Sequence, residues 1–492
     1  MLLPCAVVLL LLLGCCAGAA RAQEMEARIT VLNVSTPRVR IEGRRADATR
    51  VWSFRNAYGS LLGLGERIEN LSLKDEKGGE VAVTKLAAGE YEAAREAVRW
   101  SYEVRLDAPT TVTNSAYASW LVSGRGLLML GDLLPLMMDE KLAGKHVTRV
   151  QLELPAGWSA LSIETRLPDG NFEVADVTAA VFFIGTDLRE RRERVGQMEF
   201  SVAASGTWAF SDQDVMSMAA SILKDYAQRT GSAPRVRAML MLSPFPRAVG
   251  AERWSAETRG GTVMLLSGQS PSKVAALAQL SSPLTHELFH LWVPNGLRLE
   301  GNYDWFYEGF TLYQALVAGV RLHFLTFQDY LNALARAFDA YQAASRQQQL
   351  SLLEASRRRW TGSPALVYQK GMLVAFLYDL SLRQASRGKR ELDDVYRALF
   401  QQAGAARRDG NEVLLALLNG QEGMLDFTRR YVESASEIEL SAAVAPLGLR
   451  VERIGARTTI SADGKLTRQQ RDLWRAFGYN EDAQRALRRV SS

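Results

Sequence analysis

The residues best suited to carry chemistry are two of the four histidines in this chain. Residues 286–290 read His-Glu-Leu-Phe-His, so the two histidines are four positions apart and a glutamate follows the first. On a helix, side chains four residues apart lie on the same face, and both imidazoles can reach one metal ion. The carboxylate of Glu287 then lies where it can act on water bound to that ion. This spacing predicts a metal-dependent hydrolase.

A catalytic zinc ion usually has three protein ligands and one open position, so His286 and His290 need a third partner. Glu308 follows His290 by eighteen residues, within the run Trp-Phe-Tyr-Glu-Gly-Phe, and a helical apolar pattern follows it. A loop of this length lets a second helix turn back and present a carboxylate to the ion. We therefore expect one zinc ion per chain, bound by His286, His290 and Glu308.

Zinc fits this ligand set because it lowers the pKa of a bound water to about 7 and polarises a carbonyl group. Glu287 would accept the proton of that water and pass it to the leaving amine. The oxyanion that forms also requires a hydrogen-bond donor besides the metal. The expected reaction is hydrolysis of a peptide bond, with Glu287 as the general base.

The pattern of the chain changes between two regions that must position these residues. From about residue 27 to 167, short alternating segments are separated by Gly and Pro, which predicts an antiparallel β domain. From Ser211 onward the pattern is mainly helical up to about residue 431. The expected elements there are a helix capped by Ser211, strands at 235–242 and 261–267, and helices opened by Ser270-Pro271 and by Ser282-Pro283.

These motifs resemble those of the gluzincin metallopeptidases, and specifically those of the glycyl aminopeptidase family. Several further segments extend the resemblance from residue 117 to about residue 450. They are Tyr117-Ala-Ser-Trp-Leu, Arg125-Gly-Leu-Leu-Met, Ser351-Leu-Leu-Glu-Ala-Ser, Val367-Tyr-Gln-Lys-Gly-Met, Leu377-Tyr-Asp-Leu and Lys389-Arg-Glu-Leu-Asp-Asp-Val. The resemblance implies an α+β fold in which a β-rich N-terminal domain precedes a thermolysin-like, mainly helical zinc-peptidase domain.

The resemblance also implies roles for two further segments. The Tyr-x-Lys-Gly sequence that begins at Tyr368 is similar to one in which the tyrosine stabilises the oxyanion.

A second family segment, Gly-Gly/Ala-x-Glu-Asn/His, binds the free amine of the substrate through its glutamate. The matching stretch here is Gly260-Gly261-Thr262-Val263, with Val263 at the glutamate position. These four residues are expected to bind substrate through the backbone, and Glu252 or Glu257 could replace the missing carboxylate. Strict aminopeptidase specificity is then not expected, and peptides with a blocked amino terminus should be cleaved.

The predicted domains are a signal segment at 1–22, the β-rich domain at 23–170, the catalytic domain at 171–452 and a basic tail at 453–492. Members of the family commonly carry a C-terminal PDZ domain, and the forty or so residues after Leu449 are too few for one. Residues 1–22 combine an apolar run with small residues, which is typical of a secretory signal. The new amino terminus would be Gln23 or, if Leu12-Leu-Gly-Cys is a lipobox, a lipidated Cys15.

All three cysteines lie within residues 1–22, so the mature chain is expected to have no disulfide. The sequence predicts export to the periplasm or the extracellular space, with a lipoprotein as the alternative. No later segment is apolar for long enough to span a bilayer. His146, His323 and the Arg357–Arg359 run are expected to be structural or solvated.

The composition, with 47% apolar and 23% charged residues, is that of a globular protein. A net charge of +5 over 492 residues is too small to indicate a nucleic-acid partner. The expected partner is therefore a peptide or protein substrate. Two alternatives remain open: a relative that binds peptides without cleaving them, and a gluzincin hydrolase that acts on non-peptide substrates.

Overall fold

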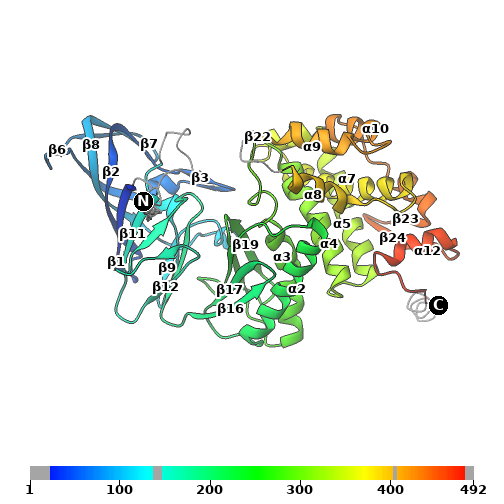
Figure 1. The fold of residues 1–492 in the computed structure, drawn as a ribbon, viewed down its shortest axis with the longest axis horizontal. Helices are drawn as coiled ribbons and strands as arrows, with labels where there is room; N and C mark the ends of the chain where they lie inside the picture. Colours follow the sequence, from blue (N-terminus) through cyan, green and yellow to red (C-terminus); the bar gives the residue numbers. More distant parts are fainter. Residues whose placement is uncertain (1–22, 137–146, 403–406, 482–492) are drawn as a thin grey trace, which may run out of the picture.

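The computed structural model describes residues 23–136, 147–402 and 407–481. The expected signal segment with Cys15, and His146, lie outside these residues. A β-rich N-terminal part, a central mixed sheet and a helical C-terminal part follow one another from left to right in Figure 1, which confirms the expected α+β fold. None of the helices in the described ranges is long and apolar enough to cross a membrane.

The N-terminal part contains two sheets, whose strands run in the orders β13-β14-β11-β1-β2-β8-β5-β6, with β7 beside β8, and β12-β15-β10-β9. The strands of the larger sheet are β1 Gln23–Asn33, β2 Arg38–Ser53, β5 Ile68–Lys74, β6 Glu80–Val81, β7 Val83–Ala87, β8 Glu90–Arg105, β11 Val147–Glu153, β13 Thr165–Arg166 and β14 Phe172–Val174. Those of the smaller sheet are β9 Trp120–Val122, β10 Arg125–Met129, β12 Ser159–Leu161 and β15 Val181–Gly185. Because β14 pairs with β11 and β15 pairs with β10, the β-rich part continues to Gly185, beyond the predicted boundary at residue 170.

The central sheet carries the strand that faces the site. Its order is β16-β17-β18-β20-β19, with β17, β18 and β20 parallel and β19 antiparallel at the edge. The strands are β16 Arg189–Val195, β17 Met198–Ala204, β18 Arg237–Pro244, β19 Trp254–Arg259 and β20 Thr262–Ser267. Helix α2 (Asp212–Thr230) begins with the expected cap, in which Ser211 and Asp214 form a reciprocal capping box.

Helix α3 (Lys273–Phe289) carries the first histidine, and it differs from the prediction at its start. Ser272 caps the helix, and Pro283 lies inside it, so the predicted second helix at Ser282 is wrong. A proline inside a helix removes one backbone hydrogen bond. The flanking residues Leu280, Leu284 and Leu288 are almost completely buried, and this apolar burial keeps the helix continuous.

The remaining helices are α1 Leu130–Leu133, which lies in the N-terminal part, and α4 Thr311–Arg321, α5 Phe327–Ser345, α6 Leu352–Arg357, α7 Pro364–Ala385, α8 Leu392–Gln401, α9 Gly410–Asn419, α10 Leu425–Thr428, α11 Leu440–Val444 and α12 Arg468–Arg475. Helix α7 has a long run of buried residues and packs against α4, α5, α6 and α8. Short strands complete the fold: β3 Ala57–Tyr58 with β4 Leu61–Leu62, β21 Leu299–Glu300 with β22 Arg408–Asp409, and β23 Leu449–Ile454 with β24 Arg457–Ala462. Trp474 of α12 is completely buried, and its ring contacts Phe327, so the described portion of the predicted basic tail packs into the helical core.

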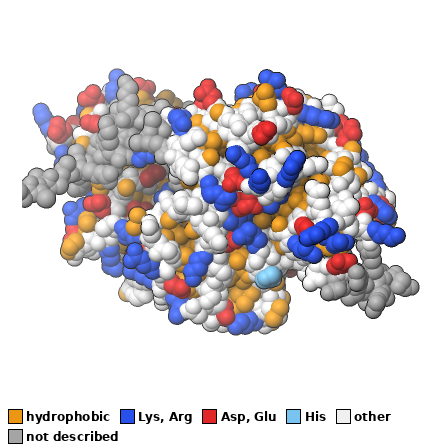
Figure 2. All heavy atoms as spheres, turned by 45° about the vertical axis from the view of Figure 1, so that its right-hand side comes forward, with side chains coloured by type: hydrophobic (Ala, Val, Ile, Leu, Met, Phe, Trp, Pro, Cys, Tyr) orange, Lys and Arg blue, Asp and Glu red, His pale blue; other side chains and the backbone are white. Residues whose placement is uncertain are grey.

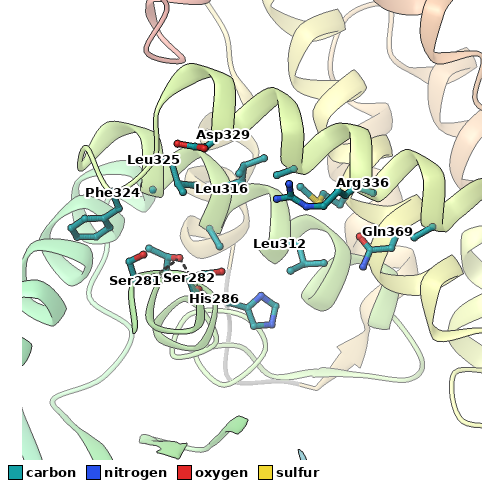
Figure 3. Close-up of a pocket in the computed structure, with 17 residues that line it drawn as sticks. Ser281, Ser282, His286, Leu312, Leu316, Phe324, Leu325, Asp329, Arg336 and Gln369 are labelled. Carbon is teal, nitrogen blue, oxygen red and sulfur yellow. Dashed lines mark hydrogen bonds between the residues drawn. The ribbon is translucent and has the colours of Figure 1, made fainter. Parts of the chain in front are cut away.

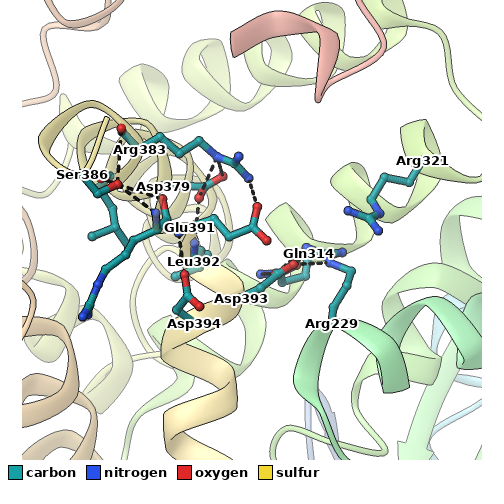
Figure 4. Close-up of polar contacts among 12 residues, drawn as sticks. Arg229, Gln314, Arg321, Asp379, Arg383, Ser386, Glu391, Leu392, Asp393 and Asp394 are labelled. Carbon is teal, nitrogen blue, oxygen red and sulfur yellow. Dashed lines mark hydrogen bonds and ion pairs between the residues drawn. The ribbon is translucent and has the colours of Figure 1, made fainter. Parts of the chain in front are cut away.

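A buried set of polar contacts joins α2 to α4 and α8 (Figure 4). Arg229 of α2 pairs with Asp393 of α8 at 2.7 Å and also donates to Gln314 of α4. Arg383 and Asp379 form a second pair within α7 at 3.2 Å. On the face in Figure 2, basic and acidic side chains are interspersed.

Candidate functional site

Three of the predicted residues come together to form a metal-binding group. The Nε2 atoms of His286 and His290 are 3.1 Å apart, and Oε2 of Glu308 lies 3.4 Å and 3.5 Å from them. Ligands that bind zinc tetrahedrally at about 2.0–2.2 Å are separated by about 3.3–3.5 Å. The donor types and their separations therefore fit a zinc ion with one position left open.

Local backbone geometry explains how Glu308 reaches the histidines. Residues Trp305–Phe310 form a wide helical turn of the π type, a form that is common at functional sites. A Cβ atom added to Gly309 would lie 2.5 Å from the Cα of Gly371, so this turn and α7 touch backbone to backbone. Ser356 accepts a hydrogen bond from the N–H of Trp305 at 2.8 Å and fixes the start of the turn.

One hydrogen bond of His290 determines which of its ring nitrogens is free to bind a metal ion. Nδ1 lies 2.8 Å from the carbonyl oxygen of Val293, so a proton on Nδ1 is donated there. Nε2 then keeps a free lone pair that faces His286 and Glu308. A ligand histidine held by such a backbone carbonyl is typical of zinc sites.

Glu287 lies beside the metal-binding group, where a general base would have to lie. It is 7% exposed and lines the same cavity as the three ligands. The hydroxyl of Thr258 on β19 lies 2.8 Å from its Oε2 atom and fixes the carboxylate. Burial raises the pKa of Glu287 to about 8, against the lowering effect of His290.

Tyr368 lies on the wall of this cavity and is linked to the metal-binding group by Arg359. The guanidinium of Arg359 donates to Oε1 of Glu308 at 2.8 Å and also to the hydroxyl oxygen of Tyr368. Because arginine can only donate, the hydroxyl proton of Tyr368 stays free for another acceptor. The prediction that Arg357–Arg359 is a solvated face is therefore wrong for Arg359, whose side chain is 11% exposed.

The cavity has a volume of about 900 Å³ and is lined by residues of the N-terminal part, β19, α3 and α7. Tyr58, Tyr117 and Trp360 contribute aromatic walls. The cavity thus has the size of a site for a small molecule or a short peptide.

The strand that lines the cavity is β19 rather than β20. Of the four residues expected to bind substrate, Gly260 lines the cavity, and Gly261, Thr262 and Val263 are not among its lining residues. Val263 is completely buried in the apolar core, because β20 lies inside the sheet and β19 forms its edge.

Of the two glutamates proposed to replace the missing carboxylate, Glu257 on β19 lines the cavity. The hydroxyl of Tyr58 donates to its Oε1 atom at 2.5 Å, and burial raises its pKa. Glu252 is exposed and pairs with Arg253, outside the cavity. Sequence position alone does not separate the two glutamates: Glu257 lies on β19, whereas Glu252 lies in the turn before it.

Thr258 and Arg359 were missed as members of the site. Neither residue belongs to a recognisable sequence motif, because tertiary contacts bring each of them to the site. His323 is exposed on the turn after α4, in keeping with a structural role.

Comparisons with known proteins agree with this geometry. Residues 279–374, which hold all three metal-binding residues and Tyr368, match the model of the M61 glycyl aminopeptidase family. No curated protein matched the chain.

Two solved structures show the same fold at low sequence identity. One is an aminopeptidase N family protein from Idiomarina loihiensis, with 18% identity, a TM-score of 0.74, and coverage of 87% of this chain and 79% of that one. The other is an M1 zinc metallopeptidase from Deinococcus radiodurans bound to a Tyr-Ser-Ala substrate, with 16% identity, a TM-score of 0.55, and coverage of 85% and 95%. The segment that carries the metal-binding group thus matches the M61 glycyl aminopeptidase family, and the chain as a whole shares its fold with these zinc-peptidase structures.

Proposed function

We propose that this protein is a zinc-dependent aminopeptidase that removes the first residue from peptides. The observation that carries the proposal is the convergence of His286, His290 and Glu308 in one cavity with Glu287. A zinc ion in this group would supply Lewis acidity that polarises a peptide carbonyl and makes water more acidic.

Each residue around this group has a separate part in the reaction. Glu287, held by Thr258, accepts a proton from the attacking water and returns it to the leaving amine. The hydroxyl of Tyr368 donates a hydrogen bond to the oxyanion. Arg359 keeps Oε2 of Glu308 directed at the two histidines by binding the other carboxylate oxygen.

The position of Glu257 supports binding of a free amino terminus. Glu257 is half-buried, and a carboxylate withdrawn from water is costly unless it is paired. Its second oxygen is not used by Tyr58. The ammonium group of a substrate would supply that pair. This arrangement reverses the expectation that blocked peptides are cleaved, which rested on Val263, a residue of the core. It also argues against the alternative of a non-cleaving relative, because Glu257 supplies the amine-binding carboxylate that Val263 lacks.

Two experiments test this proposal: removal and return of the metal, and comparison of free with acetylated peptides. A chelator should abolish cleavage, and about one equivalent of zinc should restore it. Free peptides should be preferred over their acetylated forms by about 100-fold or more in kcat/KM, which corresponds to roughly 2.7 kcal/mol. Glu257→Gln should remove most of this preference, whereas the matched control Glu252→Gln should keep it. Equal cleavage of free and acetylated peptides would contradict the aminopeptidase assignment.

A further inference from the structure

A second cavity, of about 580 Å³, adjoins the catalytic cavity between α3, α4 and α5 (Figure 3). The two cavities have Ser282, His286, Leu312 and Gln369 in common, so they meet at the first metal-binding residue. Glu257 lines only the catalytic cavity. A peptide whose amino terminus lies at Glu257 would therefore extend past His286 toward the second cavity.

Small residues on two facing helices create this space. Positions 312, 315, 316 and 319 lie on one face of α4, and positions 329, 333, 336, 337 and 340 lie on one face of α5. Five of these nine are Ala or Gly: Ala315, Gly319, Ala333, Ala337 and Ala340. Leucine, phenylalanine and methionine side chains add further apolar surface, and the polar side chains of Ser281, Ser282, Thr285 and Gln369 lie on the α3 and α7 sides. Such a surface fits an apolar side chain.

Two charged residues line this cavity, and they differ in their contacts. Asp329 is already used, because its Oδ2 atom accepts hydrogen bonds from the N–H and hydroxyl of Thr326 in the cap of α5. Arg336 is exposed and has no hydrogen-bond or ion-pair partner among the residues the structure describes. Among the residues that line the second cavity, its guanidinium is therefore the cation available to a ligand, and a carboxylate is the group it would bind.

We propose that the second cavity binds the leaving part of a short peptide, with an apolar side chain after the scissile bond and a C-terminal carboxylate at Arg336. This inference rests on the proposed function and names the substrate class of the same site. Because Arg336 is exposed, its ion pair is screened by solvent and should contribute modestly, by about five- to tenfold in kcat/KM.

The experiment compares the tripeptides Ala-Leu-Ala, Ala-Ser-Ala and Ala-Leu-Ala amide by kcat/KM. The wild-type protein should prefer the free acid over the amide by about five- to tenfold, and leucine over serine by about tenfold. Arg336→Gln should abolish the preference for the acid and keep that for leucine. Ala340→Phe, which fills the cavity, should abolish the preference for leucine and keep that for the acid. Arg346→Gln, at the end of the same helix and outside the lining, should change neither ratio.

Each ratio is internal to one protein preparation, so partial loss of folded protein does not affect it. Unchanged ratios in Arg336→Gln and Ala340→Phe, with cleavage retained, would overturn the subsite and leave the proposed function intact. Failure of the wild-type protein to cleave any of the peptides would overturn both.

Discussion

At the scale of single residues, Arg359 links the metal-binding group to Tyr368, the proposed oxyanion donor. Its side chain contacts Asp304 and Glu308, each at 2.8 Å, together with the hydroxyl of Tyr368. These contacts leave one oxygen of Glu308 and the proton of Tyr368 directed into the cavity. We therefore propose that Arg359 is a positioning residue that acts through Glu308 and Tyr368.

Replacement of Arg359 should therefore weaken metal binding and catalysis together. Arg359→Ala removes a buried charge partner of Glu308, so we expect at least tenfold weaker zinc affinity and about 100-fold lower kcat/KM at saturating zinc. Arg359→Lys should recover part of both values. Zinc titration against a chelator and peptide cleavage measure these effects. Arg358→Ala, at the exposed neighbouring position, is the control, and an equal effect there would contradict the assignment.

Tyr368→Phe should separate catalysis from metal binding. Loss of one oxyanion donor lowers turnover by about 10²–10³-fold, because the donor acts on the transition state. Zinc content should be unchanged, since Tyr368 does not contact the two histidines. Full activity of this variant would show that Tyr368 serves only in packing.

At the scale of elements, the sequence predicted those whose signals are local. The His-Glu-x-x-His spacing, the Ser211 cap and the strands β18 and β20 all follow from short-range patterns, and the structure contains them. The choice between β19 and β20 as the cavity strand depends on which one lies at the edge of the sheet. That order arises from long-range pairing, which a single sequence does not display. The same limit applies to Arg359, whose partners lie in other elements.

The close contact between the Trp305–Phe310 turn and α7 gives a prediction at this scale. Gly309→Ala would place a Cβ against the backbone of Gly371, so the two elements must move apart. We expect a loss of about 1–3 kcal/mol in stability together with weaker zinc binding, because Glu308 precedes this glycine. Thermal unfolding and zinc titration test it. Gly420→Ala, at an exposed helix end, should change neither quantity appreciably, and a harmless Gly309→Ala would contradict the packing argument.

At the scale of the whole molecule, the catalytic cavity lies where the N-terminal part meets the central sheet and the helices. Tyr58 of the N-terminal part donates to Glu257 of β19 across this boundary. Arg237 of β18 donates to Thr165 of β13 at 3.1 Å at another point of the same interface. The N-terminal part therefore provides one wall of the site in addition to its own core.

This interface should make stability depend on pH. Burial, assisted by Asp176, raises the pKa of Glu164 to about 7. A folded-state pKa above the unfolded value means that the protonated form favours folding, so stability falls as pH rises from about 4.5 to about 7. Glu164→Gln should be more stable than wild type at pH 8, by about 1–2 kcal/mol after allowance for screening at this half-buried position. At pH 4.5 the two should unfold at similar temperatures, and a difference that is the same at both pH values would contradict the argument.

The most direct test of the central claim is to measure zinc content and turnover together in Glu287→Gln. The claim is that His286, His290 and Glu308 hold the metal while the carboxylate of Glu287 moves the proton. The variant should keep about one zinc per chain and lose nearly all peptide cleavage, because an amide cannot accept the proton of water. Retained cleavage in this variant, or a wild-type protein that cleaves peptides without bound metal, would contradict the account.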